Sequence, residues 1–130
     1  MDSAEFKISD FYYGQSKEDI LRILGKPDSV WVEEGVLESN YYKGLRVDYN
    51  KNGTAYRIFA ESDKLKTPNG IHTGLSKTEL FKILGLKPNE IPSIKFENQF
   101  KNCKNNTVFF VFYDETSILK VIGIEIIGMP

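Results

Sequence analysis

The chain has very few of the residues that bind metals or form covalent cross-links. Among its 130 residues there is one cysteine, Cys103, and one histidine, His72. A single thiol cannot close an internal disulfide, and one cysteine with one histidine cannot complete a metal-binding cluster. A catalytic Cys–His pair would also need a third group to orient the base, and the sequence offers no recognisable one. We therefore expect no metal and no cofactor.

Long hydrophobic runs and an excess of one charge are lacking as well. No segment approaches the 18 consecutive apolar residues of a membrane-spanning helix. Lys and Arg number 17 against 18 Asp and Glu, a net charge of −1, so no basic footprint indicates binding to nucleic acid or an anionic membrane. Phosphate-loop, dinucleotide-binding, HExxH and CxxC patterns are missing too. We expect neither nucleic-acid binding nor a membrane span, and an enzyme is the lowest-ranked hypothesis.

The N-terminus does not read as a secretion signal. The first residues, 1-MDSAEFKISDFYY-13, lack the basic and apolar regions of a signal peptide. Two locations follow from this: the cytoplasm, or the secreted and envelope space if a signal has been removed upstream.

What the chain does contain is a repeated helix signature. The stretch 14-GQSKEDILRILG-25 returns as 74-GLSKTELFKILG-85, with six identities in twelve columns. Ser16 and Ser76 are candidate helix N-caps, and Ser76 with Glu79 makes a capping box. Apolar residues follow at the spacing of one helical face, and Gly25 and Gly85 fit the left-handed residue that ends a helix.

β-rich runs separated by short turns follow each helix. After the first come residues 29–34, 36–42, 45–49 and 54–60; after the second come 93–100, 107–113 and 118–127. Helices of two turns are marginal alone, so both must pack against these strands. We predict one α+β domain over residues 1–130, built from two tandem helix-plus-antiparallel-meander repeats, about 8–64 and 65–128. The repeats form one sheet, with the short helices on one face.

The repeated motif resembles a known superfamily. The pattern G-x-S-x-x-[DE]-[IL]-x-x-[IL]-L-G-x-P, followed by a Val-x-Tyr hairpin and a polar turn, is similar to that of the β-lactamase inhibitor proteins. It also resembles the outer-membrane assembly lipoproteins of the SmpA/OmlA type, which carry one such unit. The linker 67-TPNGIHTGLSK-77 adds to the likeness, which runs from about Ile8 to Ile127.

The resemblance implies a non-catalytic function, because members of this superfamily are binding modules. Several of them present a concave sheet to a partner protein. This chain lacks the cysteine pairs of many exported inhibitors and the N-terminal lipobox cysteine of the assembly lipoproteins. No individual inhibitory residue of the family matches a position here.

Strand alternation predicts which side chains could meet a partner. A four-residue turn at residues 50–53 pairs Val47 with Tyr56 on an apolar, helix-covered side. It leaves Arg46, Asp48, Arg57 and Phe59 on the other side. The same turn at residues 114–117 pairs Phe109 with Ile122 in the second repeat. The outward residues there are all apolar and are expected to be Val108, Phe110, Phe112, Leu119 and Val121.

The apolar outward residues of the second repeat allow two interpretations. Exposed together, they are large enough to mark an interface. A strand apolar on both faces is also typical of a central strand between two layers, covered here by residues 6–13 or 86–92. A two-residue turn at Lys43-Gly44 would put Tyr42 on the inner side with Glu38 and Asn40. We therefore expect a bulge or a longer turn there, and the pattern assigns no face to Tyr41, Tyr42 or Trp31.

The sequence therefore predicts a non-catalytic protein-binding module of the inhibitor or immunity type that binds an unidentified protein through its sheet. The alternatives are an envelope assembly domain and a surface that closes a homodimer. The candidate partner-binding residues are Trp31, Tyr41, Arg46, Asp48, Phe59, Phe110 and Phe112.

Overall fold

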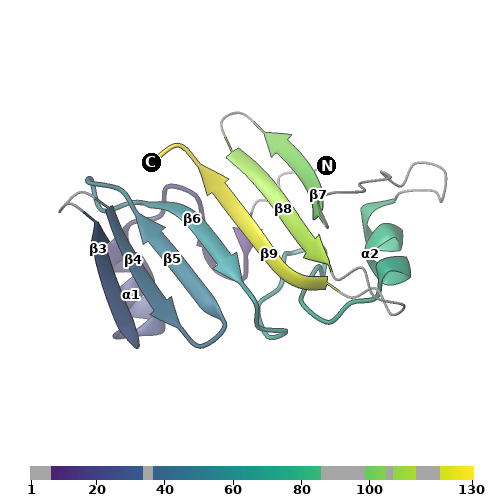
Figure 1. Ribbon diagram of the computed structural model, residues 1–130, viewed down its shortest axis with the longest axis horizontal. Coiled ribbons are helices and arrows are strands. Elements are labelled where there is room, and N and C mark those ends of the chain that lie inside the picture. Colours follow the sequence, from purple (N-terminus) through teal and green to yellow (C-terminus); the bar gives the residue numbers. More distant parts are fainter. Residues whose placement is uncertain (1–6, 34–36, 86–98, 105–106, 114–120) are drawn as a thin grey trace.

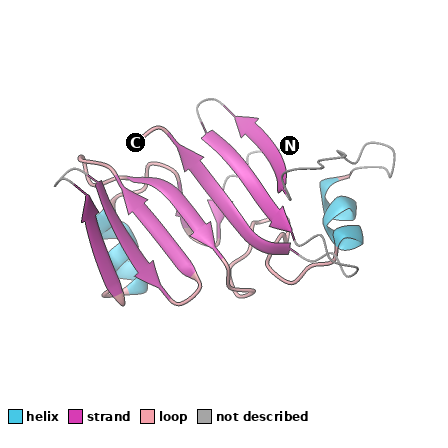
Figure 2. Cartoon of the chain, viewed as in Figure 1, coloured by secondary structure: helices cyan, strands magenta, loops and turns pink. Residues whose placement is uncertain are grey.

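The computed structural model describes residues 7–33, 37–85, 99–104, 107–113 and 121–130 and has the predicted α+β class (Figures 1 and 2). The elements in chain order are β1 (Lys7–Ile8), β2 (Phe11–Tyr12), α1 (Lys17–Leu24), β3 (Ser29–Glu33), β4 (Leu37–Tyr42), β5 (Leu45–Tyr49), β6 (Ala55–Ala60), α2 (Lys77–Leu84), β7 (Gln99–Lys104), β8 (Thr107–Tyr113) and β9 (Val121–Gly128).

A seven-stranded antiparallel sheet runs through the molecule in the order β3-β4-β5-β6-β9-β8-β7, and β1 and β2 form a separate small hairpin. The strands that follow α1 occupy one half of the sheet, and those that follow α2 occupy the other. The halves meet where β6 pairs with β9, in a register that places Ile58 opposite Ile126 and Phe59 opposite Glu125.

Both serine-capped segments are helices of eight residues. The hydroxyl of Ser16 accepts a hydrogen bond from the backbone N–H of Asp19 at 3.1 Å, and the hydroxyl of Ser76 accepts one from Glu79 at 3.1 Å. Glu79 returns the contact by accepting from the backbone N–H of Ser76 at 3.1 Å. The predicted capping box is therefore present at α2, where it satisfies amides that have no partner inside the helix.

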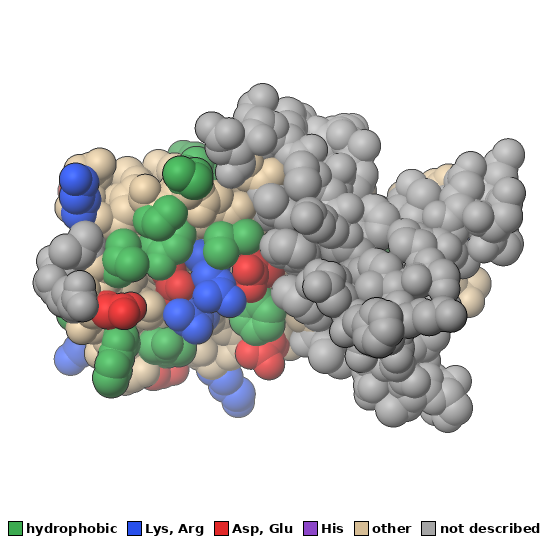
Figure 3. Space-filling view, turned by 45° about the horizontal axis from the view of Figure 1, so that its top comes forward, with side chains coloured by type: hydrophobic (Ala, Val, Ile, Leu, Met, Phe, Trp, Pro, Cys, Tyr) green, Lys and Arg blue, Asp and Glu red, His purple; other side chains and the backbone are tan. Residues whose placement is uncertain are grey.

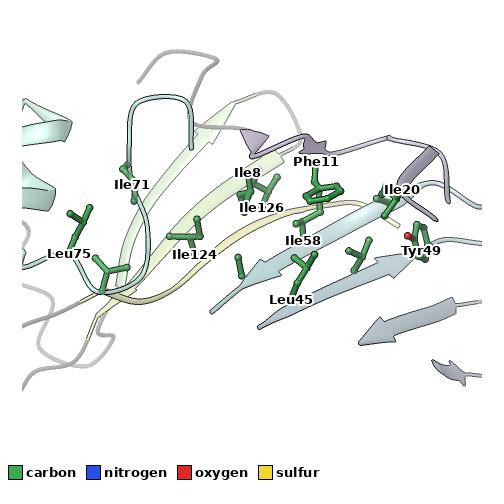
Figure 4. Packing of buried hydrophobic residues seen from close by; sticks show 14 of the residues in the cluster. Ile8, Phe11, Ile20, Leu45, Tyr49, Ile58, Ile71, Leu75, Ile124 and Ile126 are labelled. Atoms are coloured by element: carbon green, nitrogen blue, oxygen red, sulfur yellow. The ribbon is translucent and has the colours of Figure 1, made fainter. Parts of the chain in front are cut away.

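One face of the sheet carries the hydrophobic core (Figure 4). Helix α1 and the β1–β2 hairpin lie behind the sheet in Figure 1, and they contribute Ile20, Ile8 and Phe11 to the same buried cluster as Ile58 and Ile126. Helix α2 lies beyond the ends of β8 and β9 in that view and adds a buried leucine to the cluster. The expectation that the helices cover one face describes α1 well, whereas α2 packs at the end of the sheet.

The N-terminal hairpin was proposed above as one cover for Phe110 and Phe112. Its described residues lie instead on the core face, where Ile8 is fully buried and Phe11 is 2% exposed. The hairpin is therefore part of the core layer, a role that its two-residue strands did not reveal in the sequence.

The predicted register of β5 and β6 is wrong by two residues. Val47 pairs with Ile58 rather than Tyr56, and Tyr49 pairs with Ala55, with a bulge beside Tyr49. The turn is longer than four residues because the Asn50 side chain accepts hydrogen bonds from residues 52 and 54 and holds a larger loop. A shift of two keeps the alternation, so the predicted faces of Val47, Arg46 and Asp48 survive the error.

The predicted register of β8 and β9 is wrong as well. Phe109 pairs with Ile126 instead of residue 122, and Tyr113 pairs with Val121 across a bulge. Val121 is 1% exposed within the core cluster, so its predicted outward position is incorrect. Leu119, residues 93–98 and residues 86–92 lie outside the described residues, and β7 extends past residue 100 to Lys104.

The same backbone contacts precede both helices. In each half, the two residues before the helix N-cap form two backbone hydrogen bonds with one residue of the strands that follow the helix. That residue, Ala55 or Val121, lies beside the β-bulge. The four bonds, of 2.7 to 2.8 Å, are Gly14 N–H to Ala55 O, Ala55 N–H to Gln15 O, Gly74 N–H to Val121 O and Val121 N–H to Leu75 O. Gly14 and Gly74 both have φ near 90°, at 89° and 97°, which favours glycine.

Replacing either capping serine by alanine is expected to lower the free energy of unfolding by about 1 kcal/mol, because each removes a hydrogen bond to an otherwise unpaired amide. Urea denaturation of Ser16→Ala and Ser76→Ala measures this. The matched control is Ser29→Ala, an exposed serine outside both helices, with a change within about 0.5 kcal/mol. Equal small effects at all three positions would contradict the capping role.

Candidate functional site

The face of the sheet opposite α1 and the β1–β2 hairpin carries the candidate residues whose side chains the structure describes. We call it the open face and define it by Trp31, Tyr41, Arg46, Asp48, Arg57, Phe59 and Glu125. Cross-strand partners in an antiparallel ladder share a face, and the pairs that connect these residues are Trp31–Ser39, Ser39–Asp48, Asp48–Arg57, Tyr41–Arg46, Arg46–Phe59 and Phe59–Glu125.

The ladder also settles the face of the residues that the sequence left unassigned. The two-residue turn does form, with Tyr42 opposite Leu45, so Tyr42 lies on the core side and Tyr41 on the open face. Glu38 and Asn40 accompany Tyr42 on the core side, and Glu38 forms an ion pair there with Lys17 of α1. Lys17 thus provides a partner for Glu38, whereas the side-chain amide of Asn40 is buried without a hydrogen-bond partner among the described residues.

Exposure separates the five described candidates into two groups. Trp31 is 66% exposed, and Tyr41, Arg46 and Phe59 are half-buried, so all four can touch a partner. Asp48 is only 2% exposed, so it contributes to this face by holding Arg46 through an ion pair.

A row of charges crosses β5, β6 and β9 on this face (Figure 3). Arg46 Nε lies 2.9 Å from Asp48 Oδ1, and Arg57 lies 3.9 Å from the other oxygen of Asp48. Arg57 NH2 also donates to Glu125 Oε2 at 3.1 Å, across the junction between the two halves of the sheet. The two carboxylates are buried while each arginine side chain is about a third exposed, so the surface presents guanidinium groups held by acids underneath.

The pKa shifts agree with this arrangement. The hydrogen bond to Asp48 raises the pKa of Arg46 above its ordinary value, so this guanidinium stays charged. Burial raises the pKa of Glu125, and the neighbouring Arg57 opposes that rise without cancelling it. Arg57 and Glu125 were absent from the predicted site, although a lone glutamate inside 121-VIGIEIIG-128 signals a buried charge that needs a partner.

Aromatic rings border the charged row. The guanidinium carbon of Arg46 lies 5.3 Å from the centroid of the Tyr41 ring, a cation–π geometry. The Phe59 ring lies across Gly123 of β9, where an added Cβ would come within 3.0 Å of the ring. Tyr41, Arg46, Arg57 and Phe59 line a depression of about 240 Å³ beside the β4–β5 turn. The depression is large enough for one partner side chain.

Phe110 and Phe112 belong to the same ladder by register. Phe110 is paired with Glu125 and Phe112 with Gly123, and through Glu125 the first pair continues the row that contains Phe59. Their side chains lie outside the described residues, as does the side chain of Cys103 in β7.

Nothing in the described part of the chain gathers three or more His, Cys, Asp or Glu side chains in a way that could hold a metal ion. His72 lies in the connection before α2, and its ring Nδ1 is 2.8 Å from the carbonyl oxygen of Thr73. Among the described helices, none has the length and apolar character needed to cross a membrane.

Comparison with known proteins shows a likeness of fold alone. No protein-family model and no curated protein matches the sequence. A solved structure described as a cysteine-rich secretory protein from Staphylococcus aureus superimposes with a TM-score of 0.68 at 14% identity, over 89% of this chain and 44% of that one. An extracellular protein containing an SCP domain, from Bacillus anthracis, superimposes with a TM-score of 0.54 at 9% identity over the same shares. The chain thus spans less than half the length of these two proteins.

The buried carboxyl of Glu125 gives the stability of the chain a specific dependence on pH. Because its pKa is raised in the folded state from an ordinary 4.5, the stability that this group contributes is present below that value and is lost as pH rises through the folded-state pKa. We expect the unfolding free energy of the wild type, minus that of Glu125→Gln, to fall as pH rises from 4.5 through the folded-state pKa of Glu125.

Urea unfolding of both proteins across this range measures the difference. The control is Glu61→Gln, an exposed glutamate after β6, for which the corresponding difference changes less. A difference that instead grows with pH for Glu125→Gln would show that the ion pair with Arg57 outweighs burial.

Proposed function

We propose that the chain is a non-catalytic protein-binding module, of the inhibitor or immunity type, that uses the open face. The observation that carries this proposal is the arrangement of Arg46 and Arg57: both are partly exposed, and each is held from below by a buried carboxylate. An arginine whose orientation is already fixed loses little conformational freedom on binding, which is the condition for a strong contact.

The composition of the open face supports the same proposal. Trp, Tyr and Arg are the residue types that contribute most to protein interfaces, and Trp31, Tyr41 and Arg46 lie on this face together. The depression beside Tyr41 and Phe59 offers a place where one partner side chain could be enclosed. A partner that supplies a carboxylate or a carbonyl oxygen fits the exposed guanidinium groups best.

We further propose that the fold consists of two copies of one helix-plus-meander unit. The paired hydrogen bonds at Gly14 and Gly74, together with bulges beside Tyr49 and Tyr113, support equivalence between the two halves. Duplication would leave the second half with a surface of its own, which includes Phe110 and Phe112. These two positions are therefore retained in the proposed interface.

We favour a location outside the cytoplasm, since the two structural neighbours are described as secretory and extracellular. The envelope assembly function implied by the SmpA/OmlA resemblance is the second candidate, and the same location would suit it. The two candidates differ in their partner: a soluble protein to be neutralised in one case, and an outer-membrane assembly component in the other.

Site-specific crosslinking tests the proposed surface. A photoreactive phenylalanine analogue is placed at Tyr41, and the protein is added to the secreted and cell-surface fractions of the producing organism. The crosslinked protein is identified, purified and titrated against the unmodified chain. We expect Arg46→Ala to weaken that affinity by tenfold or more, because it removes a fixed guanidinium from the centre of the contact.

The matched control is Tyr12, a tyrosine of β2 that is 46% exposed on the opposite side of the sheet. The analogue at Tyr12 should give no such product, and Tyr12→Ala should leave the affinity unchanged. Equal crosslinking from Tyr41 and Tyr12, or full affinity of Arg46→Ala, would remove the open face from the proposal.

A further inference from the structure

Strand β3 forms one edge of the sheet, with β4 as its only neighbour among the described strands. All five of its residues are exposed. The three central side chains are apolar and large: Val30 is 51% exposed, Trp31 66% and Val32 54%. An edge strand of this kind presents backbone N–H and C=O groups that have no strand partner on their outer side.

Proteins usually protect such an edge with lysine, proline or a bulge. The strand 29-SVWVE-33 contains neither lysine nor proline, and its pairing with β4 runs in regular register through all five residues. Its one charge, Glu33, stands at the end of the strand. The edge is therefore left suited to accept another strand.

We propose that β3 pairs with β3 of a second copy of this chain, antiparallel and centred on Trp31. The sequence of the strand has the symmetry that such a contact requires, because a two-fold interface presents the same patch on both sides. In this register Trp31 meets Trp31 of the other copy, Val30 meets Val32, and Ser29 meets Glu33. Apolar side chains face apolar ones at the centre, and a hydroxyl faces a carboxylate at each end.

This register also keeps the two faces of the sheet continuous. Trp31 belongs to the open face, whereas Val30 and Val32 lie in line with Asn40 and Glu38 on the core side. Each pair joins two odd-numbered or two even-numbered residues. The open faces of the two copies therefore lie side by side, and so do their core sides. A shift of one residue would set Trp31 beside valine and bring Glu33 against Val30, which fits less well.

The size of the contact predicts a weak dimer. Three apolar residues that are half to two-thirds exposed bury well below the roughly 800 Å² that each partner contributes to a standard interface. About four to six backbone hydrogen bonds would join the two strands. We therefore expect dissociation in the micromolar range or weaker, so that dimer forms only in concentrated solution.

Trp31 makes the proposal directly measurable, since it is the only tryptophan in the chain. Sedimentation equilibrium of the full chain, from about 1 µM to about 500 µM, should show the mass rising from 14.9 kDa toward twice that value. Over the same range the tryptophan emission should shift to shorter wavelength by several nanometres as the indole leaves water. A constant monomer mass up to the highest concentration overturns the proposal.

Two edge variants and one control locate the contact. Val30→Lys and Val32→Lys place a charge at the two-fold pairs but keep Trp31 as reporter, and each should abolish both the mass increase and the emission shift. Ile23→Lys removes an apolar side chain of similar exposure, 47%, from α1 and should leave both unchanged. Circular dichroism confirms folding, and two edge variants allow the test to stand if one misfolds.

The outcomes separate this contact from the partner contact of the open face. Arg46→Ala, which is expected to weaken the partner, should dimerise as the wild type does, because it leaves β3 untouched. Dimerisation that persists in both edge variants, or that is lost equally in Ile23→Lys, would place the contact elsewhere and overturn the proposal. Full partner affinity in Arg46→Ala, with the dimer behaving as proposed, would count against the proposed function alone.

Discussion

Backbone pairing between β6 and β9 is the contact on which the architecture depends. The helix-plus-strand segments on either side of it are each too small to bury a core of their own, and this one antiparallel ladder merges their sheets. Ile58 and Ile126 meet across it on the core side, where Phe11 and Ile8 of the N-terminal hairpin lie beside them (Figure 4). On the other side Arg57 reaches across the same ladder to Glu125. Core and open face are thus organised by a single strand junction.

The open face shows how burial and charge cooperate. Asp48 and Glu125 are almost completely enclosed, which for an isolated carboxylate would be costly in free energy. Arg46 and Arg57 offset that cost by direct hydrogen bonds at 2.9 and 3.1 Å. The arrangement places the acidic groups under the basic ones, so a face with balanced formal charge exposes mainly guanidinium groups and aromatic rings. The β3 edge lies at the margin of this face, and the free side of the strand points away from it.

Local signals in the chain predicted some features correctly and missed others. The caps at Ser16 and Ser76 depend on hydrogen bonds within four residues, so their local pattern predicted both helices correctly. The outward positions of Arg46 and Asp48 also followed from alternation along β5, because a period of two tolerates a register error of two. Registers themselves were missed, since the side chain of Asn50 enlarges its loop and bulges form beside Tyr49 and Tyr113. The side chains of Phe110 and Phe112 fall outside the described residues.

By itself the sequence determined the α+β class, the two capped helices, the limits of β4 to β6 within one residue and the alternation of faces along them. Each of these depends on residues close together in the chain, where propensity, capping and periodicity act. Only the tertiary structure decided that β6 lies beside β9, that Glu125 is the partner of Arg57, and that the hairpin at Ile8 and Phe11 covers the core. These contacts join residues more than forty positions apart, and packing across such distances leaves no periodic signal in the chain.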